Sequence, residues 1–259
     1  MGKFIDITGK RFGKLEVIKY CGGSKWLCNC DCGGTTIVAG PDLKNGHTAS
    51  CGCNKKKFSV DDGFFESINT EEKAYVLGFI SSDGYVNKKL NQVKVDLKST
   101  DEDVLVKIKN AMNYTNSIKH YTYNLSVDGY KYVEEVSRLV ISSPKLVGDL
   151  ENLGVTQAKS NIIRFPFGCF DKSLYRHYFR GYFDGDGSIS INHKRNNAMS
   201  INITSSDEMC CDMSEILKEI FDGITIYKYH RKKSNPNNST IIVANREYVI
   251  RLMEWMYED

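Results

Sequence analysis

Long apolar runs are missing from this 259-residue sequence: 41% of its residues are hydrophobic, but no stretch stays apolar long enough to cross a membrane. The first ten residues, MGKFIDITGK, also lack the apolar segment of a secretory signal. Asp6 stands where a myristoylation signal has Ser or Thr. These absences argue against a membrane partner and predict an intracellular, cytoplasmic protein.

A large excess of either charge is missing as well, because the net charge is only +3. The balance is uneven, however. Residues 1–60 hold ten Lys and Arg against four Asp and Glu, a net charge of +6, which leaves −3 for the rest of the chain. A basic first segment favours a polyanionic partner such as a nucleic acid.

The cysteines lack the spacing of a disulfide framework. Six of the nine precede residue 54, and five of these lie in two groups about twenty residues apart, WLCNCDCGG and SCGC. Paired cysteines at that separation are typical of a tetrahedral zinc site. The favoured ligands are Cys30, Cys32, Cys51 and Cys53, with Cys28 as a substitute; buried reduced cysteines without a metal are the alternative. So short a segment builds little core, so the metal is expected to supply its folding free energy.

One pattern occurs twice in the remaining chain. A helix is expected to begin at Asn69, where Glu72 completes a capping box, and to end at Asp83. A second helix is expected from Asp171 to Asp186. In each copy an alternating strand follows and runs into Ser-Thr-Asp-Glu or Ser-Ser-Asp-Glu, and a further strand and helix come next. The alternating strand and the acidic segment that ends it occupy residues 93–103 in the first copy and 199–209 in the second. The further strand and helix occupy residues 123–140 in the first copy and 240–256 in the second. The agreement predicts duplication of one α/β unit.

Each expected helix ends in an acid. A negative charge is unfavourable there, because the C-terminal end of the helix dipole is also negative. Each also carries two small residues four positions apart, on one face, where two helix backbones can approach closely; these are Gly78 and Ser82, and Gly181 and Gly185. If the helices pack there, Asp83 meets Asp186, and two close carboxylates suit a Mg²⁺ ion. The alternative is a plain helix stop, because Asp-Gly is ordinary turn chemistry.

The segments VLGFISSDG (76–84) and FRGYFDGDG (179–187) resemble the motif of the LAGLIDADG homing endonucleases, in their single-chain, two-repeat form. The cysteine-rich segment is similar to zinc-finger-like modules of phage-type mobile endonucleases. The resemblance implies an α+β (mixed α/β) fold of two pseudo-symmetric repeats, each with the order α-β-β-α-β-β-α. Their antiparallel sheets would saddle double-stranded DNA, and a small N-terminal zinc-binding β module would precede them.

The same resemblance implies roles for single residues. Asp83 and Asp186 would be the catalytic acids that bind Mg²⁺, and Lys98 would be a basic helper that orders the attacking water. The second copy offers Thr204 in that neighbourhood, so the two halves of the site are expected to be unequal. The implied activity is site-specific double-strand cleavage of DNA by phosphodiester hydrolysis. The alternative is a catalytically inactive DNA-binding regulator or an RNA maturase.

A basic hairpin is the expected DNA-binding surface. IYKYHRKKSNPNNSTIIV reads as a strand, a polar turn and a strand, and a basic β-ribbon fits the major groove. A solvated hairpin face is the alternative. The residues expected to contact DNA are Lys194, Arg195, Lys228, Arg231, Lys232 and Lys233.

The expected organisation is a zinc module over 1–54, a linker over 55–69 and two repeats over 70–150 and 171–259, joined by a connector over 151–170. Because both copies lie in one chain, a monomer with internal pseudo-two-fold symmetry is expected. An intein-borne form is disfavoured, because the sequence neither starts with Cys or Ser nor ends in His-Asn.

Overall fold

The computed structural model describes residues 4–53, 58–127, 130–193, 198–230 and 237–258. The chain divides into two compact units, Met1–Phe58 and Ser59–Asp259, and each has its own hydrophobic core. Within the described residues, no helix combines the length and the apolar character that a membrane crossing needs.

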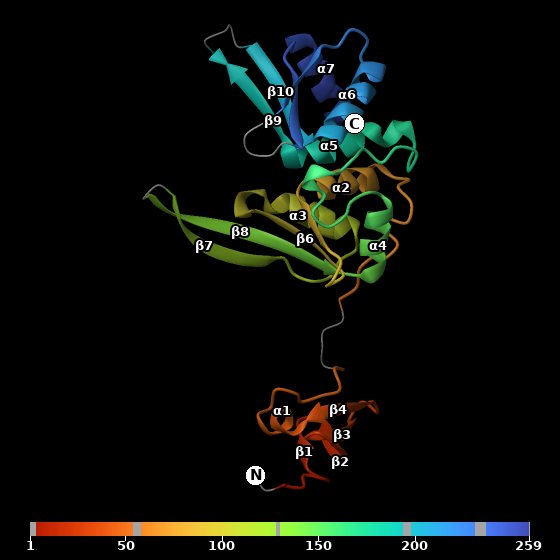
Figure 1. Ribbon diagram of the computed structural model, residues 1–259, viewed down its shortest axis with the longest axis vertical. Coiled ribbons are helices and arrows are strands. Elements are labelled where there is room, and N and C mark those ends of the chain that lie inside the picture. The colour runs from red at the N-terminus through yellow and green to blue at the C-terminus, as the bar shows by residue number, and fades with distance from the viewer. Residues whose placement is uncertain (1–3, 54–57, 128–129, 194–197, 231–236, 259) are drawn as a thin grey trace. The chain divides into compact units, whose positions relative to one another are not determined.

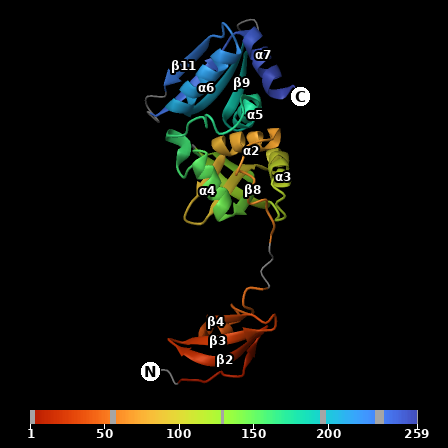
Figure 2. The ribbon, with the colours of Figure 1, turned by 90° about the vertical axis from the view of Figure 1, so that its right-hand side faces the viewer.

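The first unit is an antiparallel sheet of four strands with one short helix (Figures 1 and 2). The strands β1 (Arg11–Phe12), β2 (Leu15–Gly22), β3 (Lys25–Cys30) and β4 (Thr35–Ala39) pair in chain order, and α1 (Gly40–Lys44) follows. Alternation along β3 buries Trp26 and Cys28, which pack with Leu43 of α1. Among the described residues of this unit, eight buried side chains form the core, which is small for a unit that folds without further support.

The second unit contains the order α-β-β-α-β-β-α twice. The first copy comprises α2 (Glu71–Ser82), β5 (Gly84–Asn87), β6 (Gln92–Lys98), α3 (Glu102–Ala111), β7 (Lys119–Val127), β8 (Tyr130–Ser142) and α4 (Pro144–Asn152). The second comprises α5 (Tyr175–Asp186), β9 (Gly187–Asn192), β10 (Ala198–Ser206), α6 (Asp207–Ile220), β11 (Ile226–His230), β12 (Asn238–Val243) and α7 (Arg246–Tyr257). The two antiparallel sheets have corresponding orders, β5-β6-β8-β7 and β9-β10-β12-β11. The predicted mixed α/β fold in two repeats is therefore confirmed.

The helices α2 and α5 lie side by side between the two sheets (Figures 1 and 2), and one hydrophobic core runs through both repeats. The strands alternate in the same way in both sheets. Val93 and Val95 of β6 are buried, as are Ile201 and Ile203 of β10. The side chains that alternate with them point to the other, open face of each sheet; they include Lys94, Asp96, Asn202 and Thr204.

The start of α2 lies one residue beyond the predicted cap. Thr70, not Asn69, is the N-cap, and its hydroxyl accepts a hydrogen bond from the Lys73 amide at 3.3 Å. Both residue types cap well, so the sequence alone did not separate them. In the second copy Asp171 caps the 3-10 turn Lys172–Leu174, which leads into α5 as expected.

The helix predicted within residues 123–140 is wrong, because that stretch forms the β7–β8 hairpin. The third helix of the first repeat is α4, which begins after its N-cap Ser143. The β8 segment YKYVEEVSRLV is rich in aromatic and β-branched residues. Pairing with strands on both sides favours the extended form over a weak helical pattern.

The linker predicted over 55–69 is shorter in the structure, because its described part from Ser59 onward belongs to the second unit. Phe64, Phe65 and Ile68 are buried in that unit's core. The Ser59 amide donates a hydrogen bond to the Thr115 hydroxyl at 2.9 Å. The predicted linker therefore includes, beside its charged residues, an apolar segment that packs into the core of the second unit.

Candidate functional site

The helices α2 and α5 approach so closely that glycine is needed on both. A Cβ atom at Gly78 or at Gly181 would lie 2.1 or 2.0 Å from a carbonyl oxygen of the other helix. Closer to the helix ends, a Cβ at Gly185 would lie 2.1 Å from the Ser82 hydroxyl oxygen. The small residues singled out in the sequence therefore do form the helix crossing.

The crossing brings the C-terminal ends of the two helices together. Asp83 is the C-cap of α2, and Asp186 is the last residue of α5. The carboxyl carbon of Asp83 lies 3.3 Å from the position that a Cβ of Gly185 would take. Gly84 and Gly187 follow the acids and open the next strands; their Cβ atoms would lie 2.5 and 2.1 Å from the preceding helix turn. Each acid therefore stands where a helix turns into a strand.

The two carboxylates influence each other electrostatically. Asp83 is partly buried, and Asp186 keeps an accessible side chain although protein surrounds it on its other sides. Burial raises the pKa of Asp186 to about 6, with the Asp83 charge adding to the rise, and burial also raises the pKa of Asp83. A bound divalent cation would relieve this repulsion, and accessible carboxylate oxygens are donors that Mg²⁺ prefers. The donor set therefore fits this metal.

Lys159 is a cation built into the same site. It lies in the 3-10 turn Lys159–Asn161 between the repeats, is 7% exposed, and donates from Nζ to the Ser82 carbonyl oxygen at 2.7 Å. That carbonyl belongs to the last turn of α2, where a positive charge is favourable. Burial lowers the pKa of Lys159, and the charges of Asp186 and Asp83 oppose that shift. Its own charge opposes the rise in the pKa of both acids.

The connector that carries Lys159 is anchored on α6. The buried carboxylate of Asp212 accepts hydrogen bonds from Nη2 of Arg164 at 2.8 Å and from the Phe165 amide at 3.1 Å. The sequence indicated this connector but did not identify Lys159 as a site residue. A basic side chain in a loop shows no sign of burial until the contacts of the loop are known.

Lys98 lies at the end of β6, exposed, on the open face that Asp96 shares. A glycine follows each motif acid and shows which strand positions correspond. Gly84 pairs with Val95 in the first sheet, and Gly187 pairs with Ile203 in the second, so Val95 and Ile203 are equivalent. Thr204 therefore corresponds to Asp96 and not to Lys98. The Thr204 hydroxyl is 2.9 Å from the hydroxyl of a threonine on β12.

One of the six basic residues expected to contact DNA lies within the described residues, and it is Lys228. The others, Lys194, Arg195, Arg231, Lys232 and Lys233, lie outside them. The Lys228 ammonium lies 2.7 Å from the Asp207 carboxylate and donates to the Cys211 sulfur at 3.0 Å. Lys228 pairs with the buried Ile241, so its side chain is directed toward α6 and away from the open face.

Asp184, the other acid of the second motif, faces a different side of α5 from Asp186. Two helical positions separate them, which turns their side chains about 200° apart. The Asp184 carboxylate accepts hydrogen bonds from the Tyr75 hydroxyl at 2.8 Å and from the Tyr257 hydroxyl. It borders a cavity of about 340 Å³. Asp184 is therefore not part of the carboxylate pair.

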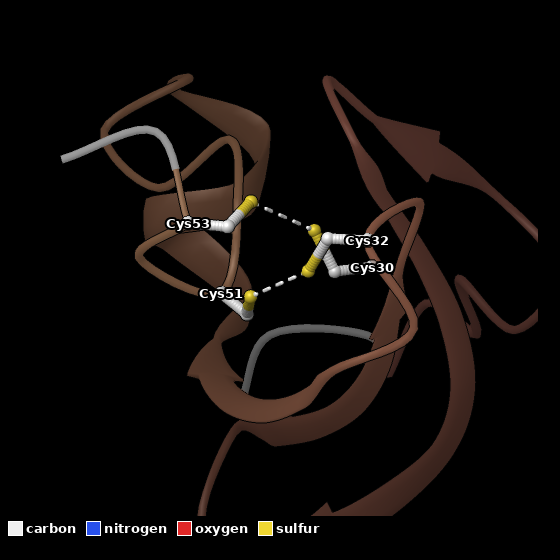
Figure 3. Close-up of side chains that lie close together, drawn as sticks. All are labelled: Cys30, Cys32, Cys51 and Cys53. Carbon is white, nitrogen blue, oxygen red and sulfur yellow. Dashed lines mark hydrogen bonds between the residues drawn. The ribbon is translucent and has the colours of Figure 1, made fainter. Parts of the chain in front are cut away.

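Four thiols meet in the first unit (Figure 3). The Sγ atoms of Cys30, Cys32, Cys51 and Cys53 all lie within 4.8 Å of one another, and two cross-pairs are 3.6 and 3.3 Å apart. Zinc–sulfur bonds of about 2.3 Å in a tetrahedron place sulfur atoms about 3.8 Å apart. The group therefore fits a zinc ion. Hydrogen bonds from the backbone amides of Cys32 and Cys51 lower the pKa of Cys30 to about 6, whereas hydrogen bonds with the neighbouring thiols raise the pKa of Cys51 and of Cys53.

Cys28, kept as a substitute ligand, lies outside this group. It is fully buried in the core of the first unit, and its thiol donates to the Trp26 carbonyl oxygen at 3.7 Å. Burial raises the pKa of the Cys28 thiol, which disfavours the thiolate. Its surroundings are those of a packed apolar side chain.

The family comparison matches the two repeats separately. A family model described as a LAGLIDADG-like domain matches residues 70–153 and 173–255. The ribonucleoside-diphosphate reductase NrdEB subunit alpha of Bacillus subtilis (strain 168) is 25% identical over 178 residues, which cover 66% of this chain and 16% of that protein. The chain thus spans about a sixth of the length of that relative.

Two solved structures also resemble the chain. The homing endonuclease I-WcaI bound to its DNA recognition sequence is 14% identical, with a TM-score of 0.45, over 70% of this chain and 80% of that one. The N-terminal LAGLIDADG domain of DUF199/WhiA is 15% identical, with a TM-score of 0.43, over 77% of this chain and 90% of that one.

Proposed function

Because the chain belongs to the LAGLIDADG-like domain family, we propose that it is a site-specific DNA endonuclease that makes a double-strand break by metal-dependent phosphodiester hydrolysis. The observation that carries the proposal is the convergence of Asp83 and Asp186 at the ends of two closely packed helices. One chain supplies both acids. The active species is therefore expected to be a monomer whose two repeats each face one half of the DNA target.

Asp83 and Asp186 are the proposed holders of Mg²⁺, which would supply positive charge beside the scissile phosphates and their leaving oxygens. The chain presents both carboxylates at the junction of helix and open sheet, and the tight helix crossing fixes their separation. Lys159 balances part of their negative charge and holds the last turn of α2 in place. We assign it to the positioning of the acid pair.

Lys98 is the proposed basic helper, because it is exposed on the open face of the first sheet. In the second repeat the strand register places Ser206 at the corresponding position. Ser206 is fully buried, and its hydroxyl donates a hydrogen bond to the Ile163 carbonyl oxygen. Only the first repeat thus offers a basic side chain at this point, so the two DNA strands are expected to be cut at unequal rates.

The open faces of the two sheets are the proposed DNA-binding surfaces, and their chemistry differs. In the first sheet Arg138 makes two hydrogen bonds with Asp96, at 2.6 and 2.7 Å, and its guanidinium lies 4.5 Å from the Tyr121 ring. The second sheet offers hydroxyl and amide groups such as those of Thr204 and Asn202. Polar side chains on alternate strand positions can read base edges. Unlike faces suit a target whose two halves differ.

In the first unit we propose a structural Zn²⁺ held by the four clustered cysteines. All four ligands come from the protein, as in closed structural sites. The metal would stabilise the small core, and the basic charge of residues 1–60 would add contacts to DNA beside the cleavage site.

A DNA-binding regulator without cleavage, or an RNA maturase, is the competing function, because one fold serves several functions. Selection from a random DNA library separates them. In Mg²⁺ we expect recovery of one asymmetric cleaved site, and in Ca²⁺ we expect recovery of the same site bound but intact. A site that is bound in both metals and never cut would support the regulator, and binding of RNA alone would support the maturase.

A further inference from the structure

A serine, a histidine and an acid meet where the first outer hairpin begins. The Ser137 hydroxyl of β8 donates to the Glu102 carboxylate at 2.5 Å. His120 of β7 places Nδ1 3.2 Å from that carboxylate and 3.3 Å from the Ser137 hydroxyl. Ser137 is fully buried, whereas the His120 side chain is 63% exposed. Glu102 is the first residue of α3, where a carboxylate is stabilised by the helix dipole.

The second repeat contains the same arrangement. The Ser239 hydroxyl of β12 donates to the Asp207 carboxylate at 2.5 Å. His230 of β11 places Nδ1 3.2 Å from that carboxylate and 3.0 Å from the Ser239 hydroxyl. Ser239 is fully buried, and Asp207 is the first residue of α6. Hydrogen bonds from Lys228 and Ser239 lower the pKa of Asp207.

Both trios sit at equivalent positions in the strand register, but His120 is the second residue of β7 whereas His230 is the last described residue of β11. In each sheet the histidine is the direct cross-strand partner of the serine, with His120 opposite Ser137 and His230 opposite Ser239. Each serine shares a strand face with buried core residues, so the trio lies on the helix-covered face and not on the open face. The trios therefore join the outer strands to the helix layer and leave the DNA-facing surface free.

The connections that supply the two acids differ, although the resulting contacts agree. In the first repeat the 3-10 turn Ser99–Asp101 precedes α3, whereas α6 follows β10 directly. The matching of Ser-Thr-Asp-Glu with Ser-Ser-Asp-Glu aligns Asp101 with Asp207, yet Glu102 makes the contact. Two unlike segments thus place a carboxylate against the corresponding serine and histidine of each repeat.

We propose that the first trio, His120, Ser137 and Glu102, is a positioning clamp that fixes the angle of the first outer hairpin and thereby sets how that hairpin contacts the outer base pairs of one half-site. This inference rests on the proposed DNA-binding function. The first hairpin, β7 and β8, extends past α3 (Figure 1), and it exposes Tyr130 and Val133 by 80% and 61%. Little packing therefore supports it beyond the clamp.

The lever arm makes the clamp angle important for base reading. Seven residues of β7 lie beyond His120, a length of about 24 Å. A tilt of about 5° at the base moves the far end by about 2 Å, which exceeds the tolerance of a hydrogen bond to a base edge. The buried Ser137 hydroxyl, which also lies 3.4 Å from the Ser99 hydroxyl, holds the hairpin against such a tilt together with Glu102 and His120.

The test compares Ser137→Ala with Ser239→Ala in the full-length protein. Each change removes one buried hydroxyl and keeps the strand. The matched control is Ser142→Ala, on the same strand as Ser137, where the exposed hydroxyl only accepts from the Gln92 side chain. Binding is measured in Ca²⁺ against every single-base variant of the selected target.

We expect Ser137→Ala to reduce discrimination about tenfold at the outer positions of one half-site, and Ser239→Ala to leave discrimination in that half-site unchanged. The Ser142→Ala profile should match that of the unchanged protein. His120→Ala, at a partly exposed position, should repeat the half-restricted pattern of Ser137→Ala if that serine variant folds poorly. Unchanged profiles, or an equal loss in both halves, would overturn the clamp proposal alone. An unchanged protein that binds no DNA would overturn the proposed function and the clamp with it.

Discussion

At the scale of single residues, the site combines two acids with one buried cation. The positive charge of Lys159 offsets part of the repulsion between Asp83 and Asp186. Its hydrogen bond to the Ser82 carbonyl oxygen joins the connector to α2. A buried ammonium is costly unless it is paired. Its position beside the acid pair therefore indicates a role in the site beyond packing.

Replacement of Lys159 by methionine keeps the length of the side chain and removes the charge. We expect cleavage at saturating Mg²⁺ to fall at least about tenfold, because the acid pair loses a nearby positive charge and a fixed helix end. The control is Lys172→Met, which breaks an exposed ion pair with Glu219. Single-turnover rates on the selected target measure the effect, and a Lys159→Met rate within twofold of normal would contradict this role.

At the scale of elements, the crossing of α2 and α5 determines where the acids lie. At the contact, glycines let the two helix backbones touch, so the helices can pack closely in one relative position only. Packing of this kind tolerates little added volume. The geometry of the carboxylate pair thus follows from glycines that lie within about one and a half helical turns before the acids.

Gly181→Ala should destabilise the second unit by about 3 kcal/mol, because its Cβ would collide with the backbone of α2. Gly148→Ala, in the interior of α4 where a Cβ meets nothing within 4 Å, should instead stabilise it by up to about 1 kcal/mol. Urea unfolding of both variants gives the two free energies. Equal effects at the two positions would show that the helices do not cross at Gly181.

The elements that could be predicted from the sequence are those with strong local signals. The two motif helices, their small residues and the acids at their ends were all predictable, because capping, periodicity and Asp-Gly turns are local. The β8 strand was not, since its pairing with distant strands outweighs its weak helical pattern. Lys159 and the serine–histidine–acid trios were missed for the same reason: their partners lie far away in the sequence.

At the scale of the whole molecule, two units with separate cores are joined in one chain. The first has a small core and a cluster of four thiols, and the second has a large core shared by both repeats. Metal binding commonly supplies the folding free energy of such small units. The two units are therefore expected to respond differently to metal removal.

Purified protein should contain one zinc ion per chain, and chelation should unfold the first unit while the second stays folded. Cys30→Ala should abolish zinc binding, whereas Cys28→Ala should keep it, because Cys28 packs in the core outside the cluster. Metal analysis and amide hydrogen exchange measure both effects. A zinc-free first unit that remains folded would show that the four cysteines are only buried thiols.

Deletion of residues 1–58 should shorten the DNA footprint and flatten the salt dependence of binding, because this part of the chain carries a net charge of +6 whereas the rest carries −3. For every phosphate that the deleted segment neutralises, the slope of log affinity against log salt should become shallower by about 0.9. Cleavage at saturating protein should stay within a few-fold, since both acids lie in the second unit. An unchanged footprint and slope would assign the first unit to a protein partner or to stability.

Cleavage of a plasmid that carries the selected site tests whether Asp83 and Asp186 form one metal-dependent cleavage centre. In Mg²⁺ the unchanged protein and the control Asp184→Asn should linearise the plasmid, and neither should do so in Ca²⁺. Asp83→Asn and Asp186→Asn should each abolish linearisation while DNA binding stays within about tenfold, because the metal site is lost and the fold is kept. Normal linearisation by either the Asp83→Asn or the Asp186→Asn protein would contradict a single shared centre.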